Sequence, residues 1–384
     1  MSRIAVIGSG PGAFFTVKYI LKRNLPNLSR IDIYEKLPSP FGLVRFGVAP
    51  DHSEVKEVTN EFRSVLKSNP ERVKLLVNSE IRESESLKSL KGSYDAVLIA
   101  TGAQESKRLP MKILPVNTFS AQDFVLWYNG HPEKQELVMP EAPRNVSVVG
   151  HGNVALDVAR MLSKSAVELR PLVESGLLTR KAHDWFATRQ ALQGLKSVSI
   201  FGRRGYLDAA FTNKEFRELT TMSDAVCRVD ESELEDTIDN LREKTSADRA
   251  KSRGLSILSK CVTSNGLAKS NEIFLRFFCK PIKYVGNPAR EIIVENVSGC
   301  QESVSVDMGI ESIGFRVSEK LGLPMDQTTG GVAHDGRGRV VGWPGFYVSG
   351  WAKRGPKGVI AANIPCSIET AEAMHEDLLS SSRH

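Results

Sequence analysis

Two short glycine-rich segments of this 384-residue chain have the spacing of turns that bind phosphate groups. Residues 8–13 follow the apolar run 3–7, and residues 150–155 follow the apolar run 145–149. Glycine lets the backbone approach a pyrophosphate, and the helix that begins at such a turn supplies free N–H groups and a partial positive charge. Ala13 takes the third glycine position of the first segment, which the pattern permits. Two such turns predict two bound dinucleotides.

The residue that would meet the adenosine ribose differs between the two segments. Glu35 ends the alternating run 30–35, near the spacing of a carboxylate that binds a ribose 2′-hydroxyl. Behind the second segment, the strand-like run 198–202 leads instead into Arg203 and Arg204. Two guanidinium groups favour a 2′-phosphate over a 2′-hydroxyl. The second segment is therefore predicted to bind NADP.

A third glycine-rich segment, near the C-terminus, favours a flavin at the first turn. Residues 345–351 are typical of a strand and a turn, and residues 353–360 are expected to open a long apolar helix. A reduced flavin acquires negative charge at the N1 and O2 edge of its ring, and a helix N-terminus stabilises such charge. The alternative is an ordinary strand, turn and helix with lysines on the surface.

The elements around these segments predict an α/β fold with two Rossmann-like dinucleotide-binding domains, in the arrangement of glutathione reductase. The FAD-binding domain is expected to be discontinuous and to comprise residues 1–108 and 317–384, and the NADP-binding domain comprises residues 109–316. The expected helices are 14–25, 53–68 and 121–128, and the expected strands include 73–77, 94–100, 273–278, 292–294 and 304–308. The charged stretch 230–253 is read as a solvated helix or a mobile segment.

Composition is that of a globular protein and limits the classes of partner. Hydrophobic residues make up 41% and charged residues 25%, and no apolar run approaches the roughly 18 residues of a membrane span. The net charge of +6 suits an acidic protein, nucleic acid or an anionic membrane surface, and equally a solvated surface. A strand is expected by about residue 3, which leaves no room for a cleavable targeting segment in this sequence.

The cysteines predict neither a metal site nor a redox dithiol. They lie far apart in the sequence and form no C-x-x-C motif, at Cys227, Cys261, Cys279, Cys300 and Cys366. Reduced thiols are expected. A flavoprotein that passes electrons through a disulfide needs a nearby dithiol, so electrons are expected to leave the flavin directly.

Five blocks of sequence, in order and spanning nearly the whole chain, resemble adrenodoxin reductase, the mitochondrial NADPH–ferredoxin reductase family. They are residues 34–52, 152–160, 202–205, 211–215 and 350–356. The resemblance implies that FAD is bound by Gly8, Gly10, Pro11, Gly12, Ala13, Glu35, Lys36, Leu43, Val48, Thr101, Gly102, Trp351, Gly358, Val359 and Ile360. It implies that NADPH is bound by Gly152, Asn153, Val154, Arg203, Arg204, Glu215 and Gly358.

The resemblance further implies a site beside the flavin. His52 and Asp157 are expected to meet there and link the two domains, with a catalytic role in proton transfer or a role in partner docking. Two residues depart from the family pattern. His151 stands where the family usually has Gln, which would alter contact with the pyrophosphate, and Lys357 stands where it usually has Thr. The charge of Lys357 either reinforces the helix terminus or faces solvent.

The function that the resemblance implies is hydride transfer from NADPH to FAD, followed by single-electron transfer to an acidic [2Fe–2S] ferredoxin. Arg242, Lys244 and Arg249 are candidate docking residues. A mitochondrial monomer without a nucleic-acid partner is expected, with peripheral membrane association left open. Two alternatives stay open: an NADPH-dependent flavin enzyme acting on small acceptors, and a nucleotide-bound scaffold or redox sensor without turnover.

Overall fold

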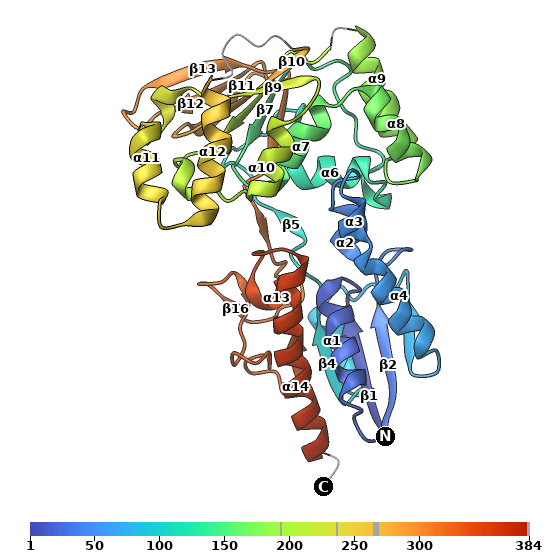
Figure 1. The fold of residues 1–384 in the computed structure, drawn as a ribbon. Helices are drawn as coiled ribbons and strands as arrows, with labels where there is room; N and C mark the ends of the chain where they lie inside the picture. Colours follow the sequence, from blue (N-terminus) through green and yellow to red (C-terminus); the bar gives the residue numbers. More distant parts are fainter. Residues whose placement is uncertain (193, 236, 264–268, 382–384) are drawn as a thin grey trace. The chain divides into compact units, whose positions relative to one another are not determined.

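The computed structural model describes residues 1–192, 194–235, 237–263 and 269–381, which form two compact units (Figure 1). Unit 1 contains Met1–Val48, His52–Glu105 and the chain from Gly314 onward, and unit 2 contains Ala49–Asp51 and Ser106–Ile313. The divisions after Glu105 and Ile313 each precede the expected boundary by three residues. The three residues 49–51 join unit 2, which the sequence did not suggest.

Unit 1 is built on a parallel sheet of five strands in the order β18-β4-β1-β2-β3, with the first glycine turn following β1. Ile4 of β1 lies opposite Ile31 of β2 on one side and Ala96 of β4 on the other. The strands are β1 (Ser2–Ile7), β2 (Leu28–Tyr34), β3 (Val73–Leu76), β4 (Ala96–Ile99) and β18 (Phe346–Val348). The apolar runs form strands because both faces of a parallel sheet are covered.

Helices complete unit 1. They are α1 (Pro11–Lys22), α2 (Gly42–Phe46), α3 (Ser53–Lys56), α4 (Val58–Ser68), α5 (Ser84–Leu90), α13 (Trp351–Arg354), η4 (Ile360–Ala362) and α14 (Asn363–Ser381). Short strands β16 (Met325–Asp326) and β17 (Gly331–Val332) pair with each other, and β15 (Phe315–Arg316) pairs with β5 (Glu105–Ser106). The long helix α14 packs along α1 and closes one face of the sheet (Figure 1).

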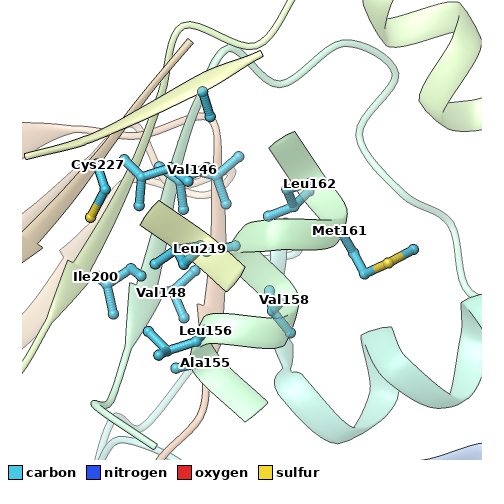
Figure 2. Close-up of a cluster of buried hydrophobic side chains, with 14 of the residues drawn as sticks. Val146, Val148, Ala155, Leu156, Val158, Met161, Leu162, Ile200, Leu219 and Cys227 are labelled. Atoms are coloured by element: carbon cyan, nitrogen blue, oxygen red, sulfur yellow. The ribbon is translucent and has the colours of Figure 1, made fainter. Parts of the chain in front are cut away.

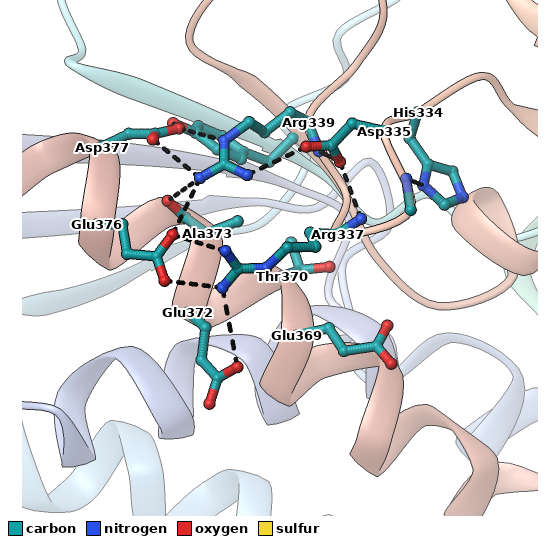
Figure 3. Close-up of polar contacts among 12 residues, drawn as sticks. His334, Asp335, Arg337, Arg339, Glu369, Thr370, Glu372, Ala373, Glu376 and Asp377 are labelled. Atoms are coloured by element: carbon teal, nitrogen blue, oxygen red, sulfur yellow. Dashed lines mark hydrogen bonds and ion pairs between the residues drawn. The ribbon is translucent and has the colours of Figure 1, made fainter.

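Ion pairs attach α14 to the loop that precedes β18 (Figure 3). Arg337 forms a bidentate pair with Glu376, with N–O distances of 2.7 and 2.8 Å. Arg339 forms a second bidentate pair with Asp377, at 2.7 and 2.9 Å, and also contacts Asp335 at 3.1 Å. Paired guanidinium and carboxylate groups hold fixed geometry, so the C-terminal helix is fixed to the sheet that carries the first glycine turn.

Unit 2 contains a six-stranded parallel sheet in the order β6-β14-β7-β8-β10-β9 and a three-stranded antiparallel sheet. The parallel strands are β6 (Thr118–Ser120), β7 (Asn145–Val149), β8 (Ser197–Phe201), β9 (Ala225–Arg228), β10 (Asn271–Arg276) and β14 (Met308–Glu311). The antiparallel strands are β11 (Lys280–Val285), β12 (Glu291–Glu295) and β13 (Gln301–Ser305). The helices are α6 (Ala121–Tyr128), η1 (Pro132–Lys134), α7 (Asn153–Ser163), α8 (Ala166–Glu174), α9 (Arg180–Leu192), η2 (Tyr206–Asp208), α10 (Asn213–Thr220), η3 (Glu231–Glu233), α11 (Ile238–Thr245) and α12 (Arg249–Thr263).

The core of unit 2 lies between this sheet and α7 (Figure 2). Leu156 and Leu162 of α7 are fully buried against Val148 of β7 and Ile200 of β8. Leu219 of α10 joins the same cluster. The helix that begins at the second glycine turn is therefore positioned by packing along its whole length.

Several sequence expectations need correction. The helix expected over 53–68 breaks at Glu57 into α3 and α4, and the strand expected over 304–308 is the end of β13 followed by the first residue of β14. The strand β11 was not expected. The charged stretch 230–253 contains η3, α11 and the start of α12. The helix expected to open at 353–360 begins instead at Asn363. The short helix α13 ends at Arg354, and the positive φ values of Gly355 and Gly358 are incompatible with a continuous α-helix through this segment.

Candidate nucleotide-binding sites

The structure explains why each of three positions in the first turn is occupied by glycine. Gly8 has φ +98°, and an added Cβ would lie 2.6 Å from the Ala100 carbonyl oxygen. An added Cβ on Gly12 would lie 3.0 Å from Cα of Gly350. Gly10 precedes α1 with extended φ and ψ, and no protein atom lies within 4 Å of an added Cβ. At Gly8 and Gly12 the neighbouring backbone leaves no room for a side chain. At Gly10 the open space in front of a helix N-terminus fits a phosphate group.

Glu35 stands beside this turn with its carboxylate already oriented. The residue is 6% exposed at the end of β2, and its carboxylate accepts hydrogen bonds from Ser9 Oγ and, at 2.9 Å, from the backbone N–H of Leu37. A carboxylate oxygen has further lone pairs for a ribose hydroxyl. The sequence analysis missed Ser9, although its position between two turn glycines was the available signal.

Other predicted FAD residues surround the same turn. Phe41 donates its backbone N–H to the Ser9 carbonyl, and the added Cβ of Gly42 would lie 3.6 Å from Gly10 Cα, so α2 with Leu43 begins at the turn. Thr101 Cα lies 3.2 Å from the added Cβ of Gly8. Predicted residues of unit 1 that flank these positions are Pro11, Ala13, Lys36, Val48 and Gly102. The chain thus brings the β1, β2 and β4 ends of the sheet to one place, as a Rossmann fold requires.

The C-terminal segment reaches this turn through Gly350. Gly350 has φ +72°, its N–H donates to Cys366 Sγ at 3.3 Å, and Trp351 follows at the start of α13. Arg354 then fixes the loop, donating to the Lys357 carbonyl at 3.0 Å and to Asn363 Oδ1 at 3.2 Å. The two contacts join residues three and nine positions apart in sequence, and neither had a signal in the sequence pattern. They hold the loop between α13 and α14 in a defined shape.

That loop presents exposed groups where the sequence predicted flavin contacts. Lys357 and Gly358 are exposed, and Val359 is 61% exposed, with Ile360 beginning η4. A large exposed apolar residue next to a positive-φ glycine fits a surface that a ligand covers. The exposure of Lys357 is compatible with both alternatives stated for it.

The second turn repeats the geometry of the first in unit 2. Gly150 has φ +125°, and an added Cβ would lie 2.2 Å from the Ser312 carbonyl oxygen. Gly152 precedes α7 without a side-chain cap, and an added Cβ there meets no protein atom within 4 Å. Asn153 Oδ1 accepts the backbone N–H of Thr212 at 2.8 Å and so holds the segment that leads into α10. The open position at Gly152 again fits a phosphate.

The charged residues predicted around this turn also fit NADPH. Arg203 and Arg204 follow β8 and are exposed, and neither has an ion pair with a described residue. Glu215 lies in the first turn of α10, and its Oε2 is buried without a hydrogen-bond partner in the described chain. Val154 is half-buried in the first turn of α7. The arrangement leaves two guanidinium groups and one carboxylate oxygen available to a nucleotide.

His151 does not point at the phosphate position, which corrects the expectation of an altered pyrophosphate contact. Its ring packs edge-on against Phe277 with centroids 4.8 Å apart, and its Nε2 lies 3.1 Å from the Ile200 carbonyl oxygen. Gly202 accommodates the ring, since an added Cβ would lie 2.3 Å from His151 Nδ1. Burial lowers the pKa of His151 to about 4. The imidazole is therefore neutral at pH 7 and supplies no charge to the turn.

The buried imidazole predicts an acid-sensitive stability. Because the pKa of about 4 in the folded protein lies below the ordinary histidine value of 6.5, the unfolded chain binds more protons than the folded chain between these pH values. Stability is complete above pH 6.5 and falls by about 3 kcal/mol as the pH drops toward 4. His151→Gln keeps a hydrogen-bond donor for the Ile200 carbonyl but has no titrating group. We expect the free energy of unfolding of this variant to fall by about 3 kcal/mol less than that of the unchanged protein between pH 7 and pH 4, as measured by urea unfolding. Equal losses in both proteins would contradict the assignment.

His52 and Asp157 are each placed, but in different units. His52 directly precedes α3 in unit 1, without a side-chain capping hydrogen bond to that helix, and is 8% exposed. Asp157 lies on α7 in unit 2, 2.8 Å from Nη2 of Arg160. Their meeting beside the flavin stays a prediction.

Arg160 is the central cation of a partly buried cluster of charged side chains in unit 2, and the sequence analysis assigned it no role. Its guanidinium pairs with Asp51 at 2.8 and 2.9 Å, with Asp157 at 2.8 Å and with Glu218 at 3.4 Å. Burial would lower the pKa of Arg160, but the hydrogen bonds that Arg160 donates to Asp51 and the charge of Asp157 raise it. The ion pairs explain why residues 49–51 belong to unit 2.

Arg160→Met should lower the free energy of unfolding by about 3–5 kcal/mol, because it leaves partly buried carboxylates without their cation. Arg242→Met is the matched control, since the pair of Arg242 with Asp239 is largely exposed and should contribute under about 1 kcal/mol. Urea denaturation of both variants measures the difference. Similar midpoints would contradict a structural role for the Arg160 cluster.

Comparison with known proteins identifies the family. A family model described as pyridine nucleotide-disulphide oxidoreductase matches residues 2–198. The mitochondrial NADPH:adrenodoxin oxidoreductase of Arabidopsis thaliana is 35% identical over 98% of this chain and 82% of its own length. The NADPH-ferredoxin reductase FprA of Mycobacterium tuberculosis is 33% identical over 98% of this chain and 84% of its own. The chain belongs to the adrenodoxin reductase family.

Solved structures agree with this family assignment. Mycobacterium tuberculosis FprA in complex with NADPH superposes with a TM-score of 0.90 at 30% identity, over 100% of this chain and 86% of that one. Thioredoxin reductase of T. acidophilum matches with a TM-score of 0.55 at 14% identity and shares the fold alone. The expected resemblance and the expected α/β fold class are confirmed.

Two cysteines that lie far apart in the sequence meet in the fold of unit 2. Cys227 of β9 and Cys261 of α12 are both buried, free thiols joined by a hydrogen bond. That hydrogen bond and burial raise the pKa of Cys227 well above its usual value. A thiol so protected from ionisation is a poor nucleophile. The pair therefore has the character of core packing.

Among the described residues, no helix is long and apolar enough to span a bilayer. No group of three or more His, Cys, Asp or Glu side chains among them is arranged to hold a metal ion.

Proposed function

We propose that this chain is an FAD-dependent NADPH–ferredoxin reductase. Its membership in the adrenodoxin reductase family supports the enzyme class, FAD, NADPH and an iron–sulfur protein as electron acceptor. The observation that carries the proposal is the pair of open glycine positions, Gly10 and Gly152, each in front of a helix N-terminus. They offer one dinucleotide site to each unit.

FAD is assigned to unit 1, in a domain of residues 1–108 and 317–384. Gly10 and the N-terminus of α1 would bind its pyrophosphate, Glu35 would accept a hydrogen bond from its ribose, and the exposed loop with Gly358 would lie against its ring. The remaining proposed contacts are Gly8, Pro11, Gly12, Ala13, Lys36, Leu43, Val48, Thr101, Gly102, Trp351, Val359 and Ile360. Bound FAD supplies the conversion between two-electron and one-electron chemistry.

NADPH is assigned to unit 2, in a domain of residues 109–316. Arg203 and Arg204 would pair with its 2′-phosphate, and Gly152 with the start of α7 would bind its pyrophosphate. The buried free oxygen of Glu215 would accept a hydrogen bond from the nucleotide. Asn153 and Val154 shape the turn, and Gly358 of unit 1 is the further proposed contact.

Hydride transfer needs no protein nucleophile, so the side chains act by positioning and electrostatics. His52 and Asp157 are proposed to act beside the reacting rings, in proton transfer or in docking of the partner. Arg160 is proposed as a positioning residue, because it holds Asp157 and also Asp51, the neighbour of His52.

The electron acceptor is proposed to be an acidic [2Fe–2S] ferredoxin. The net charge of +6 supports attraction to an acidic protein, which gives fast association that salt weakens. Arg242, Lys244 and Arg249, on α11 and α12, are the candidate docking residues. We also propose a monomeric state, peripheral membrane association and a mitochondrial location. The mitochondrial relatives support that location, and the similar bacterial FprA supports a bacterial location equally.

Ferredoxin-dependent reduction of cytochrome c with purified, FAD-loaded protein tests the proposal. We expect NADPH to support turnover that requires the ferredoxin and slows as ionic strength rises. An FAD-loaded enzyme that is inactive with every [2Fe–2S] partner tried would refute the assignment.

A further inference from the structure

A buried arginine in unit 2 has no carboxylate partner among the described residues. Arg189 of α9 is 3% exposed, and its Nη2 donates to the Leu162 carbonyl oxygen at the end of α7. Its guanidinium lies 5.5 Å from the ring centroids of Trp185 and Phe186. Nε and Nη1 are buried without a hydrogen-bond partner in the described chain. Unit 2 therefore contains a buried cation with unused donors.

Within the part of the chain that the structure describes, no carboxylate forms an ion pair with this cation. Burial is the one cause of the shift that lowers the pKa of Arg189 to about 10, so the group stays protonated at pH 7. Glu168, on the neighbouring helix α8, is committed to the capping box with Ser165. Asp224 also lines the cavity next to Arg189, but the charge of its carboxylate does not contribute to the shift in the pKa of Arg189. A buried charge without a counter-charge is costly, which points to an anion from outside the chain.

Arg189 lines a cavity of about 70 Å³ at the amino-terminal edge of the parallel sheet. The end of α7, the segment just before β8 and the first residue of β10 lie around it, whereas Arg203 and Arg204 follow the other end of β8. A buried water needs about 10–15 Å³ of such space, so the cavity holds several waters or one small oxyanion. It is too small for a nucleotide and separate from the predicted NADPH site.

Two further lining groups are buried without partners among the described residues, namely Ser163 Oγ and Asn271 Oδ1. Asn271 Nδ2 faces carbonyl oxygens, that of Asp224 at 3.2 Å and that of Ser163 at 3.4 Å. These contacts fix the amide so that Oδ1 is an acceptor in need of a donor. The cavity thus combines a cation, a hydroxyl group and a hydrogen-bond acceptor.

We propose that this cavity is a binding site for inorganic phosphate. Oxygens of hydrogen phosphate would accept hydrogen bonds from Arg189 Nε and Nη1 and from Ser163, and its remaining O–H would donate to Asn271. Sulfate has no O–H at neutral pH and would leave Asn271 Oδ1 without a donor. Chloride would satisfy the charge without the directional contacts.

The competing explanation is that Arg189 merely caps the C-terminus of α7. A cation at a helix C-terminus is favourable, and this explains the hydrogen bond to Leu162. It leaves Nε, Nη1, Ser163 Oγ and Asn271 Oδ1 unexplained except by water. The two explanations predict opposite responses to phosphate.

The test begins from Arg203→Gln with Arg204→Gln, which removes the predicted 2′-phosphate site. Thermal unfolding and ³¹P NMR would follow added phosphate at constant ionic strength, with sulfate and chloride as controls. We expect a saturable rise in Tm with phosphate, about tenfold weaker binding of sulfate and no saturable effect of chloride. Absence of a saturable phosphate response, or equal responses to phosphate and sulfate, would overturn the proposal.

Arg189→Met in the same background separates binding from capping. If the cavity binds phosphate, the variant loses the phosphate response and, in phosphate-free buffer, has a Tm no lower than its parent, because an unpaired buried charge has been removed. The proposal would be contradicted if Arg189→Met kept the rise in Tm with phosphate. It would also be contradicted if the Tm of Arg189→Met in phosphate-free buffer were lower than that of its parent while the parent showed no response to phosphate. Ser163→Ala, which keeps the charge, should weaken ³¹P-detected binding several-fold and serves if Arg189→Met fails to fold.

Discussion

Replacing Arg203 and Arg204 by glutamine should remove the preference for NADPH over NADH. Both side chains are exposed at the end of β8 and have no ion pair with a described residue. Each hydrogen bond to a charged group contributes about 1.5–3 kcal/mol, so losing two should raise the KM for NADPH about 10²- to 10⁴-fold. The KM for NADH, which lacks the 2′-phosphate, should change little.

Steady-state reduction of a ferredoxin or an artificial acceptor measures both KM values. The matched control is Arg170→Gln with Arg180→Gln, exposed arginines of α8 and α9 in the same unit, which removes the same charge. That control should leave the nucleotide preference intact. Equal losses in the two double variants would mean that overall charge, and no specific 2′-phosphate contact, sets the preference.

Gly10→Val and Gly152→Val should separate the two nucleotide sites. Both glycines have negative φ with extended ψ, which valine adopts, and an added Cβ meets no protein atom within 4 Å at either position. The folded chain should therefore tolerate each side chain, while the space needed by a pyrophosphate is filled. We expect Gly10→Val to be purified without flavin, and Gly152→Val to be yellow but unable to bind NADPH.

Flavin absorbance, circular dichroism and NADPH titration check these results. Gly8→Val and Gly150→Val provide the contrast, because both positions have positive φ and an added Cβ would lie 2.6 and 2.2 Å from a carbonyl oxygen. These two should be destabilised even without nucleotide. A Gly10→Val protein that keeps a full complement of FAD would contradict the role given to this turn.

The sequence predicted what local pattern controls. Glycine spacing and apolar runs gave both turns, and α6 runs over the expected 121–128, with Ser120 capping it through the N–H of Asp123. The long C-terminal helix begins at Asn363, later than predicted. Glycines in a sequence are compatible both with the start of a helix and with a loop of positive φ, so their spacing did not locate the first helical residue. Strand β11 was missed because half of its residues are charged or exposed on an antiparallel ribbon.

Contacts between distant residues could not be predicted. The pairing of Arg160 with Asp51 joins positions 109 apart, and the thiols of Cys227 and Cys261 meet only because α12 covers β9. His151 was expected at the phosphate, but its ring packs under the turn where Gly202 leaves room. In each case the decisive partner is set by packing between elements.

Anaerobic titration of the purified protein with NADPH and with NADH tests whether electrons pass from NADPH through FAD to a ferredoxin. We expect a yellow protein whose flavin absorbance is bleached by NADPH, far less readily by NADH, and restored when an oxidised [2Fe–2S] ferredoxin is added. A colourless protein that cannot be reconstituted with FAD would contradict it.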